Sequence, residues 1–148
     1  MFGGTFMADH QRKTALFILL PMIGTFVIQR LVLHHSSPDT HVWVAGFLVH
    51  HLFWGILALV PTAFLLAFGV STPWKRNLAL ATLGFSSAMV LDEVIYLVCT
   101  DGSGVAYRGG VSLWGAVTLL GLASVFLLGV QGMRRRCAEA QPDPGETP

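Results

Sequence analysis

The chain has 148 residues, of which 53% are hydrophobic and only 11% are charged, and its mean hydropathy is +0.65. Because a soluble domain carries about 25% charged residues, this composition indicates that lipid is the main solvent of the chain. The formal net charge is +1, and no basic surface remains for a nucleic acid once the membrane-flanking residues are assigned. The composition therefore argues against a soluble domain and against a nucleic-acid partner.

Four apolar stretches follow one another along the chain, and each is long enough to cross a membrane. A helix needs about 20 apolar residues to cross about 30 Å of hydrocarbon. The expected spans are residues 14–35, 42–70, 77–99 and 109–131. Helical length excludes the alternating pattern of a membrane barrel, and short connections make sequence neighbours antiparallel. We predict an all-α fold, a polytopic membrane four-helix bundle with antiparallel up-down topology.

Basic residues mark one side of the predicted bundle. Arg12 and Lys13 precede the first span, Lys75 and Arg76 separate the second from the third, and residues 134–136 follow the fourth. All of them fall on one side of a four-span protein, and the positive-inside rule assigns that side to the cytoplasm. We therefore expect a multi-pass protein of the cytoplasmic (inner) membrane with both termini inside.

The expected domain organisation is one membrane unit with two short flanks. Residues 1–13 form a cytoplasmic lead, and residues 14–133 form the transmembrane domain. Residues 134–148 are expected to be a disordered cytoplasmic tail, because their prolines and acidic residues cannot bury apolar surface. Cys99 and Cys137 would lie about a bilayer apart, so they cannot form a disulfide with each other.

Histidines gather towards the outer side of the first two spans. Five of the six histidines lie there: His34, His35, His41, His50 and His51. At 1.5 Å per residue, His50 and His51 would lie roughly 12 Å below the outer start of span two. Helical rotation aligns His51 with Gly55 and other small residues, so we expect this imidazole to face the bundle.

Span three carries two acidic residues at a matching depth. Asp92 and Glu93 would lie roughly 10 Å below its outer end, with Glu93 on the same face as Tyr96 and Asp92 on the flank. An ionisable group in hydrocarbon costs at least about 2.5 to 3.5 kcal/mol, so these carboxylates need partners. Arg30 of span one can neutralise one of them, which leaves the other for a metal ion, a proton or a ligand.

Imidazoles combined with carboxylates form a ligand set for Zn²⁺ or non-haem iron. We predict a zinc or iron site in the outer half of the bundle with His51 and Glu93 as core ligands. Four further residues would complete or orient it: His50, Asp92, His34 and His35. Three others would position a substrate or an anion: Arg30, Gln29 and Tyr96. If the protein is an enzyme, which the sequence leaves open, its substrate would be a lipid-soluble small molecule entering from the bilayer.

Three other interpretations stay open beside the metal site. Membrane four-helix bundles can ligate haem through histidines on facing helices, so a haem or quinone electron-transfer protein is one of them. A proton or ion transporter that uses the same histidines and carboxylates is another. In the third, an Arg30–Asp92 pair only holds helices together and the histidines contact headgroups. A homo-oligomer would bury additional helix surface and is also compatible with four short spans.

A short pattern in the two middle spans resembles a known group of proteins. It consists of His50-His51 followed by Phe53-Trp54-Gly55, and then Leu91-Asp92-Glu93. It is similar to that of small, uncharacterised prokaryotic four-span integral membrane proteins with a His-His motif in span two and an Asp-Glu motif in span three. The resemblance implies that these positions pair with each other, and it implies no activity.

Overall fold

The computed structural model describes residues 3–36, 43–44, 47–48 and 50–139. The helices in chain order are α1 (Gly3–His35), α2 (His51–Ala67), α3 (Pro73–Cys99), α4 (Gly104–Arg108) and α5 (Gly110–Glu139). Two short antiparallel strands, β1 (Trp43–Val44) and β2 (Phe47–Leu48), lie between α1 and α2. Apart from this small pair of strands and the connecting turns, the described chain is helical, which confirms the all-α prediction.

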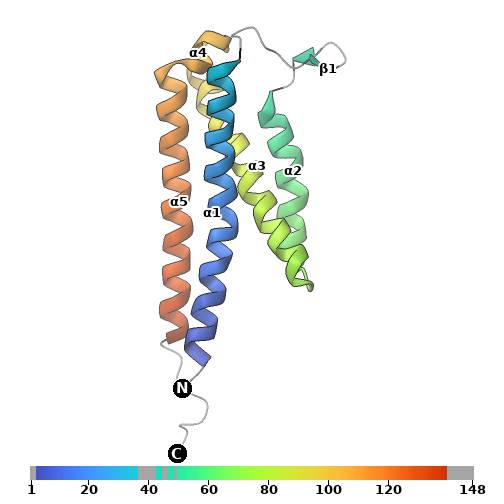
Figure 1. The fold of residues 1–148 in the computed structure, drawn as a ribbon, viewed down its shortest axis with the longest axis vertical. Coiled ribbons are helices and arrows are strands. Elements are labelled where there is room, and N and C mark those ends of the chain that lie inside the picture. The colour runs from blue at the N-terminus through green and yellow to red at the C-terminus, as the bar shows by residue number, and fades with distance from the viewer. Residues whose placement is uncertain (1–2, 37–42, 45–46, 49, 140–148) are drawn as a thin grey trace, which may run out of the picture.

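The long helices pack as an antiparallel bundle (Figure 1). Helices α1 and α3 run in one direction, and α2 and α5 run in the other (Figure 1). Helix α3 packs against α1, α2 and α5, and α1 also contacts α5. Because α3 touches each of the other long helices, it is the element on which polar side chains are most readily shielded from lipid.

Two glycines allow neighbouring helices to approach α3 at backbone distance. A Cβ atom added at Gly84 would lie 2.1 Å from the carbonyl oxygen of Ile18 on α1. A Cβ atom added at Gly55 of α2 would lie 2.9 Å from Cβ of Met89 on α3. Small residues have this role in membrane helices, where van der Waals contact between backbones replaces the hydrophobic effect as the force that joins helices.

The described side chains place apolar groups outside and polar groups inside. Exposed large apolar residues include Leu20, Ile28, Leu57, Phe64, Val125 and Phe126, and buried polar residues include Ser86, Asp92, Glu93 and Ser112. Three helical segments, Lys13–His35, Pro73–Cys99 and Gly110–Cys137, are long and apolar enough to cross a membrane. The arrangement is inverted relative to a soluble protein, which suggests that the chain lies in a lipid bilayer.

Helix α2 is shorter than the helix that the sequence predicts over 42–70. It begins at His51 and has 17 residues, which corresponds to about 25 Å. Glu93 of α3 explains this start, because its Oε2 atom accepts a hydrogen bond of 2.7 Å from the backbone N–H of Leu52. The carboxylate thus satisfies a free N–H in the first turn, while the N-cap residue His50 makes no side-chain capping bond.

The two flanks of the membrane unit are more helical than the sequence indicates. Helix α1 begins at Gly3, so most of the expected lead is helical, and α5 continues through residues 134–139 of the expected tail. Basic residues near the end of α5, among them Arg136, are favourable next to the negative end of the helix dipole. Residues 140–148 of the expected tail lie outside the described residues.

Candidate functional site

The carboxylate of Asp92 on α3 is fully buried and is shared by side chains from three other helices. Arg30 of α1 donates from Nε to Oδ1 at 2.8 Å, and its Nη2 lies 2.6 Å from the same oxygen. Tyr107 of α4 donates its hydroxyl to Oδ2. His51, the first residue of α2, places Nε2 3.4 Å from Oδ2. A guanidinium, a phenol and an imidazole therefore surround one carboxylate.

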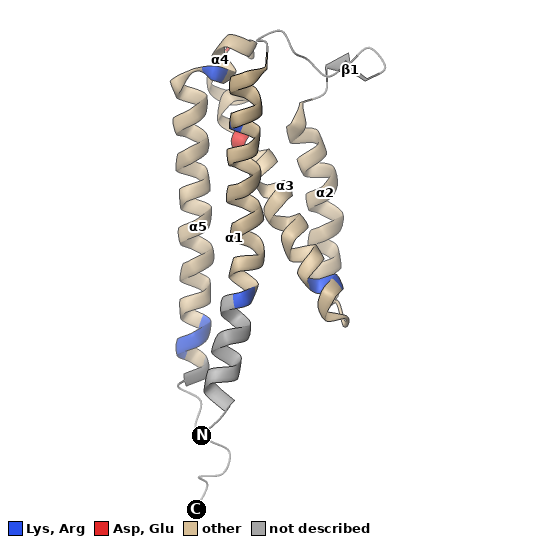
Figure 2. Ribbon diagram, in the orientation of Figure 1, with Lys and Arg blue, Asp and Glu red and all other residues tan. Residues whose placement is uncertain are grey.

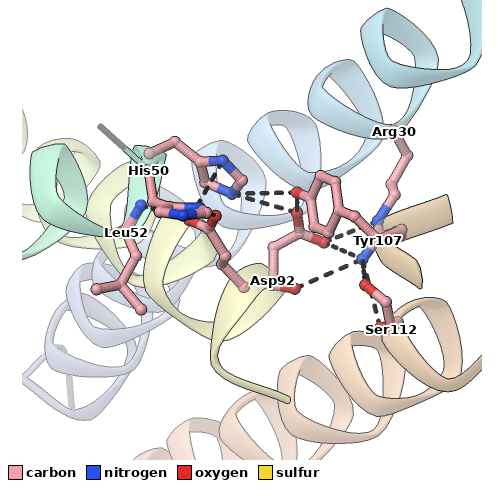
Figure 3. Close-up of polar contacts among 8 residues, drawn as sticks. Arg30, His50, Leu52, Asp92, Tyr107 and Ser112 are labelled. Carbon is pink, nitrogen blue, oxygen red and sulfur yellow. Dashed lines mark hydrogen bonds and ion pairs between the residues drawn. The ribbon is translucent and has the colours of Figure 1, made fainter. Parts of the chain in front are cut away.

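The neighbouring carboxylate of Glu93 is also buried and faces the start of α2. His50 places Nδ1 against Oε1, and the Leu52 N–H binds Oε2. His51 places Nδ1 3.4 Å from Oε2. His51 therefore lies between two carboxylates, with one ring nitrogen towards each, and Figure 3 shows this network of contacts.

Arg30 joins four helices at this end of the bundle. Besides Asp92 on α3, it reaches the carbonyl oxygen of Tyr107 on α4, to which Nη1 donates at 3.2 Å. Its Nη2 donates to Oγ of Ser112 on α5 at 3.2 Å, and its central carbon lies 5.0 Å from the centre of the Tyr107 ring. Since the guanidinium has five N–H donors in a rigid fork, one side chain can hold all these acceptors.

Tyr107 links the arginine side of the cluster to the histidine side. Its hydroxyl donates to Asp92 and lies 3.2 Å from Nε2 of His51. Burial, followed by the nearby charge of Asp92 and the hydrogen bond to it, raises the pKa of the Tyr107 phenol well above its usual value of about 10. The phenol therefore keeps its proton at neutral pH and acts as a donor to the carboxylate.

Of the residues that the sequence assigns to substrate or anion positioning, Tyr96 lies beside this cluster. Tyr96 is buried, and the centre of its tilted ring lies 4.7 Å from that of Tyr107. Its hydroxyl donates to the carbonyl oxygen of Gly102. Oε1 of Gln29 is shielded from solvent and has no hydrogen-bond partner within the part of the chain that the structure describes. Their role towards a ligand stays a prediction.

The other predicted ligands lie apart from the carboxylates. His34 and His35 are exposed at the end of α1, with ring centres 5.4 Å apart, and Nδ1 of His35 lies 2.8 Å from the carbonyl oxygen of Leu31. His41 is outside the described residues. The predicted ligands that the structure brings together are His50, His51, Asp92 and Glu93.

The metal site predicted at these residues finds no support in the structure. Over residues 13–36 and 50–137, whose side chains the structure describes, no group of three or more His, Cys, Asp or Glu residues could hold a metal ion. The physical reason is that imidazole nitrogens and carboxylate oxygens point at each other in pairs. A metal site requires them to converge on one centre with lone pairs available.

Sequence reasoning missed Tyr107 and Ser112. Tyr107 falls in the expected outer loop and Ser112 at the start of the fourth span, 77 and 82 positions from Arg30. The available signal was the arginine itself, because a guanidinium at the membrane interior needs more acceptors than one carboxylate supplies. A tyrosine close to the same end of the bundle was a candidate partner.

No protein family model matches the chain, and no curated protein or solved structure matches it. The family therefore stays unidentified, and the resemblance to four-span prokaryotic proteins depends on the short motifs alone. What the fold and the cluster define is a class of protein: a small helical protein with three long apolar helices and buried histidine–carboxylate pairs.

Proposed function

We propose that the chain is a four-span protein of the cytoplasmic membrane whose cluster of His50, His51, Asp92 and Glu93 binds one exchangeable proton. The direction of the helices supports the fourth span. Since α1 and α3 run the same way, the chain between them must return across the same thickness, and α2 is the apolar helix in that segment (Figure 1). Its 17 residues lie at the lower limit for a crossing helix.

The observation that carries the proton proposal is the position of His51 between acceptors. Nδ1 faces Oε2 of Glu93, and Nε2 faces both Oδ2 of Asp92 and the hydroxyl oxygen of Tyr107. A neutral imidazole has one N–H and can donate to one side only, whereas an imidazolium donates to both. Because the Tyr107 hydroxyl donates its hydrogen bond to Asp92, its oxygen is left as an acceptor for His51.

The balance of charges supports the same conclusion. Asp92 and Glu93 contribute two negative charges, and Arg30 contributes one positive charge, so the cluster is one charge short of neutrality when both histidines are neutral. Uncompensated charge inside a membrane protein is costly. One proton shared between an imidazole and a carboxylate removes the imbalance.

The surroundings of the cluster favour proton exchange with one side of the membrane over proton conduction across the bundle. On the far side of the cluster the core consists of Met22, Ala88 and Leu120, which offer no hydrogen bonds. Ser86, also buried, donates its hydroxyl to the carbonyl oxygen of Thr82 in its own helix. The proton would therefore serve a reaction or a binding event at this end of the bundle.

Nuclear magnetic resonance of the full chain in lipid bilayers tests the proposal, with ¹⁵N-labelled histidine and ¹³C-labelled carboxylates. As the pH is lowered and the cluster takes up its proton, both ring nitrogens of His51 should become donors. The Asp92 or Glu93 carboxyl signal should shift in the same step. The variant His51→Gln should lose this coupled change, and His34→Gln, an exposed control histidine on α1, should keep it.

Two results would overturn the proposal. In the first, His51 stays in one neutral tautomer throughout the pH range while other histidines titrate. In the second, the purified protein retains about one equivalent of zinc or iron that is lost in His51→Gln and kept in His34→Gln, as expected for a metal ligand. The cluster would then rearrange around a metal, as the sequence alone suggests.

A further inference from the structure

A second polar site lies at the end of the bundle opposite the cluster, where α1, α3 and α5 enclose a pocket. Its polar lining residues are Thr14 of α1, Arg76 of α3, and Gln131 and Arg134 of α5. Two guanidinium groups, a hydroxyl and an amide thus face one space. The proton-binding cluster uses none of these residues.

The chemistry of this lining matches a phosphate group. Arginine presents parallel N–H donors that fit phosphate oxygens, and hydroxyl and amide groups add single hydrogen bonds. Arg76 is held in position by α1, because its Nη2 donates to Oγ1 of Thr14 at 3.2 Å. The contact fixes one guanidinium at the wall of the pocket, with Arg134 lining the same space from α5.

The position of the pocket at the end of the apolar helices favours a lipid headgroup as the source of a bound phosphate. Leu127 and Val130 line it one to two turns before Arg134, near the end of the apolar segment Gly110–Cys137. Lys and Arg residues gather at this end of α1, α3 and α5 (Figure 2). Basic pockets between membrane helices at headgroup level bind anionic lipids.

We infer that this pocket binds the phosphate of an anionic phospholipid. The phosphate contacts Arg76 and Arg134, and an acyl chain lies along Leu127 and Val130. A free phosphate ion could make the same polar contacts, but it would make no apolar contact with Leu127 and Val130. The inference concerns a different end of the molecule from the proton site and does not depend on it.

Native mass spectrometry of the full-length protein, titrated with phosphatidylglycerol after removal of bound lipid, tests the inference. The double variant Arg76→Gln/Arg134→Gln should raise the Kd about 100-fold, because the direct hydrogen bonds from each guanidinium to the charged phosphate contribute at least about a factor of ten. The matched control Lys75→Gln/Arg136→Gln removes the same charge from residues that do not line the pocket, and its Kd should stay at the wild-type value. If the double variant fails to fold, Arg134→Gln alone, a change at an exposed position, replaces it in the comparison of Kd values.

Three outcomes would refute the site. An equal loss of affinity in both double variants would show diffuse attraction between lipid and basic residues. Equal binding of phosphatidylcholine, which carries no net charge, would remove the need for the guanidinium pair. Displacement of phosphatidylglycerol by inorganic phosphate at the same concentration would identify the occupant as a free ion.

Substitution of both arginines by lysine should give an intermediate Kd, since lysine keeps the positive charge and loses the paired N–H donors of the guanidinium.

Discussion

Tyr107 connects the arginine side of the buried cluster to its histidine side. It donates to Asp92, lies within hydrogen-bond distance of His51, and accepts a hydrogen bond from Arg30 through its carbonyl oxygen. Loss of its hydroxyl would remove the link between arginine and histidine without changing the volume of the side chain much. The ring would still fill the space beside Tyr96.

The change Tyr107→Phe should therefore alter how stability depends on pH. Since the pKa of Tyr107 is raised in the folded protein, the folded state keeps the proton where the unfolded chain, with a pKa of about 10, has released it. The resulting stabilisation is present below about pH 10 and is lost as the pH rises further. At neutral pH the variant should lose about 1 to 3 kcal/mol, because Asp92 loses a buried donor.

Denaturant unfolding in lipid-detergent bicelles from neutral to strongly alkaline pH measures both effects. The wild-type free energy of unfolding should fall more steeply above about pH 10 than that of Tyr107→Phe. Parallel curves for the two proteins would show that Tyr107 is not a buried proton donor in the folded state.

Helix α3 organises the molecule at the level of elements. It supplies both buried carboxylates, and one of them caps α2 at Leu52. Its approach to α1 depends on Gly84, where the backbone of Ile18 occupies the space of a side chain. The site and the packing of the bundle are thus properties of the same helix, and a displacement of α3 would disturb both.

The variant Gly84→Ala should separate α1 from α3. An added methyl group would lie 2.1 Å from a backbone oxygen that cannot rotate away, so we expect a loss of about 1 to 3 kcal/mol, the usual range for overpacking. Gly24→Ala is the matched control, since its new methyl group would meet nothing within 4 Å. The unfolding free energies of both variants in bicelles check this, and equal values would contradict the close crossing.

At the scale of the whole molecule, the main prediction concerns topology. Four spans place Asp101, after α3, on the opposite side of the membrane from Ser71, before α3, and from Cys137 near the end of α5. Single-cysteine proteins with Asp101→Cys, Ser71→Cys or native Cys137 can be labelled in intact cells with a membrane-impermeant maleimide. Only Asp101→Cys should react before permeabilisation, because the positive-inside rule places the basic end in the cytoplasm. Reaction of Ser71→Cys from outside would contradict this topology.

The sequence predicts the helical fold and much of the cluster for a physical reason. Apolar runs and helical periodicity are local properties, and the cost of burying Arg30, Asp92 and Glu93 requires that they find partners. The pairing of Arg30 with Asp92, which the sequence suggests, is present in the structure. The choice between a metal and a proton at the histidines depends on the direction of each ring nitrogen. Helical periodicity gives the face on which a histidine lies but not the orientation of its ring.

Other features could not be predicted because they depend on contacts between distant parts of the chain. The start of α2 is set by Glu93, which lies 41 positions from the residue it caps. Residues 42–50 are apolar enough to extend a helix, but residues 43–44 and 47–48 pair as β1 and β2. The β-branched and aromatic residues on either side of Gly46 are a weak local signal for strands. The role of Tyr107 depends on the path of a short connection between two helices, where periodicity carries no information.

The short α2 has a consequence for the lipid around the protein. A helix of 17 residues is about 5 Å shorter than the hydrocarbon of a typical bilayer, whereas its neighbours are long enough. Such a hydrophobic mismatch is relieved by local thinning of the membrane on the flank of the short helix. The headgroup region would then descend towards His50 and His51 at the start of α2, so water would reach the histidines without a channel through the bundle.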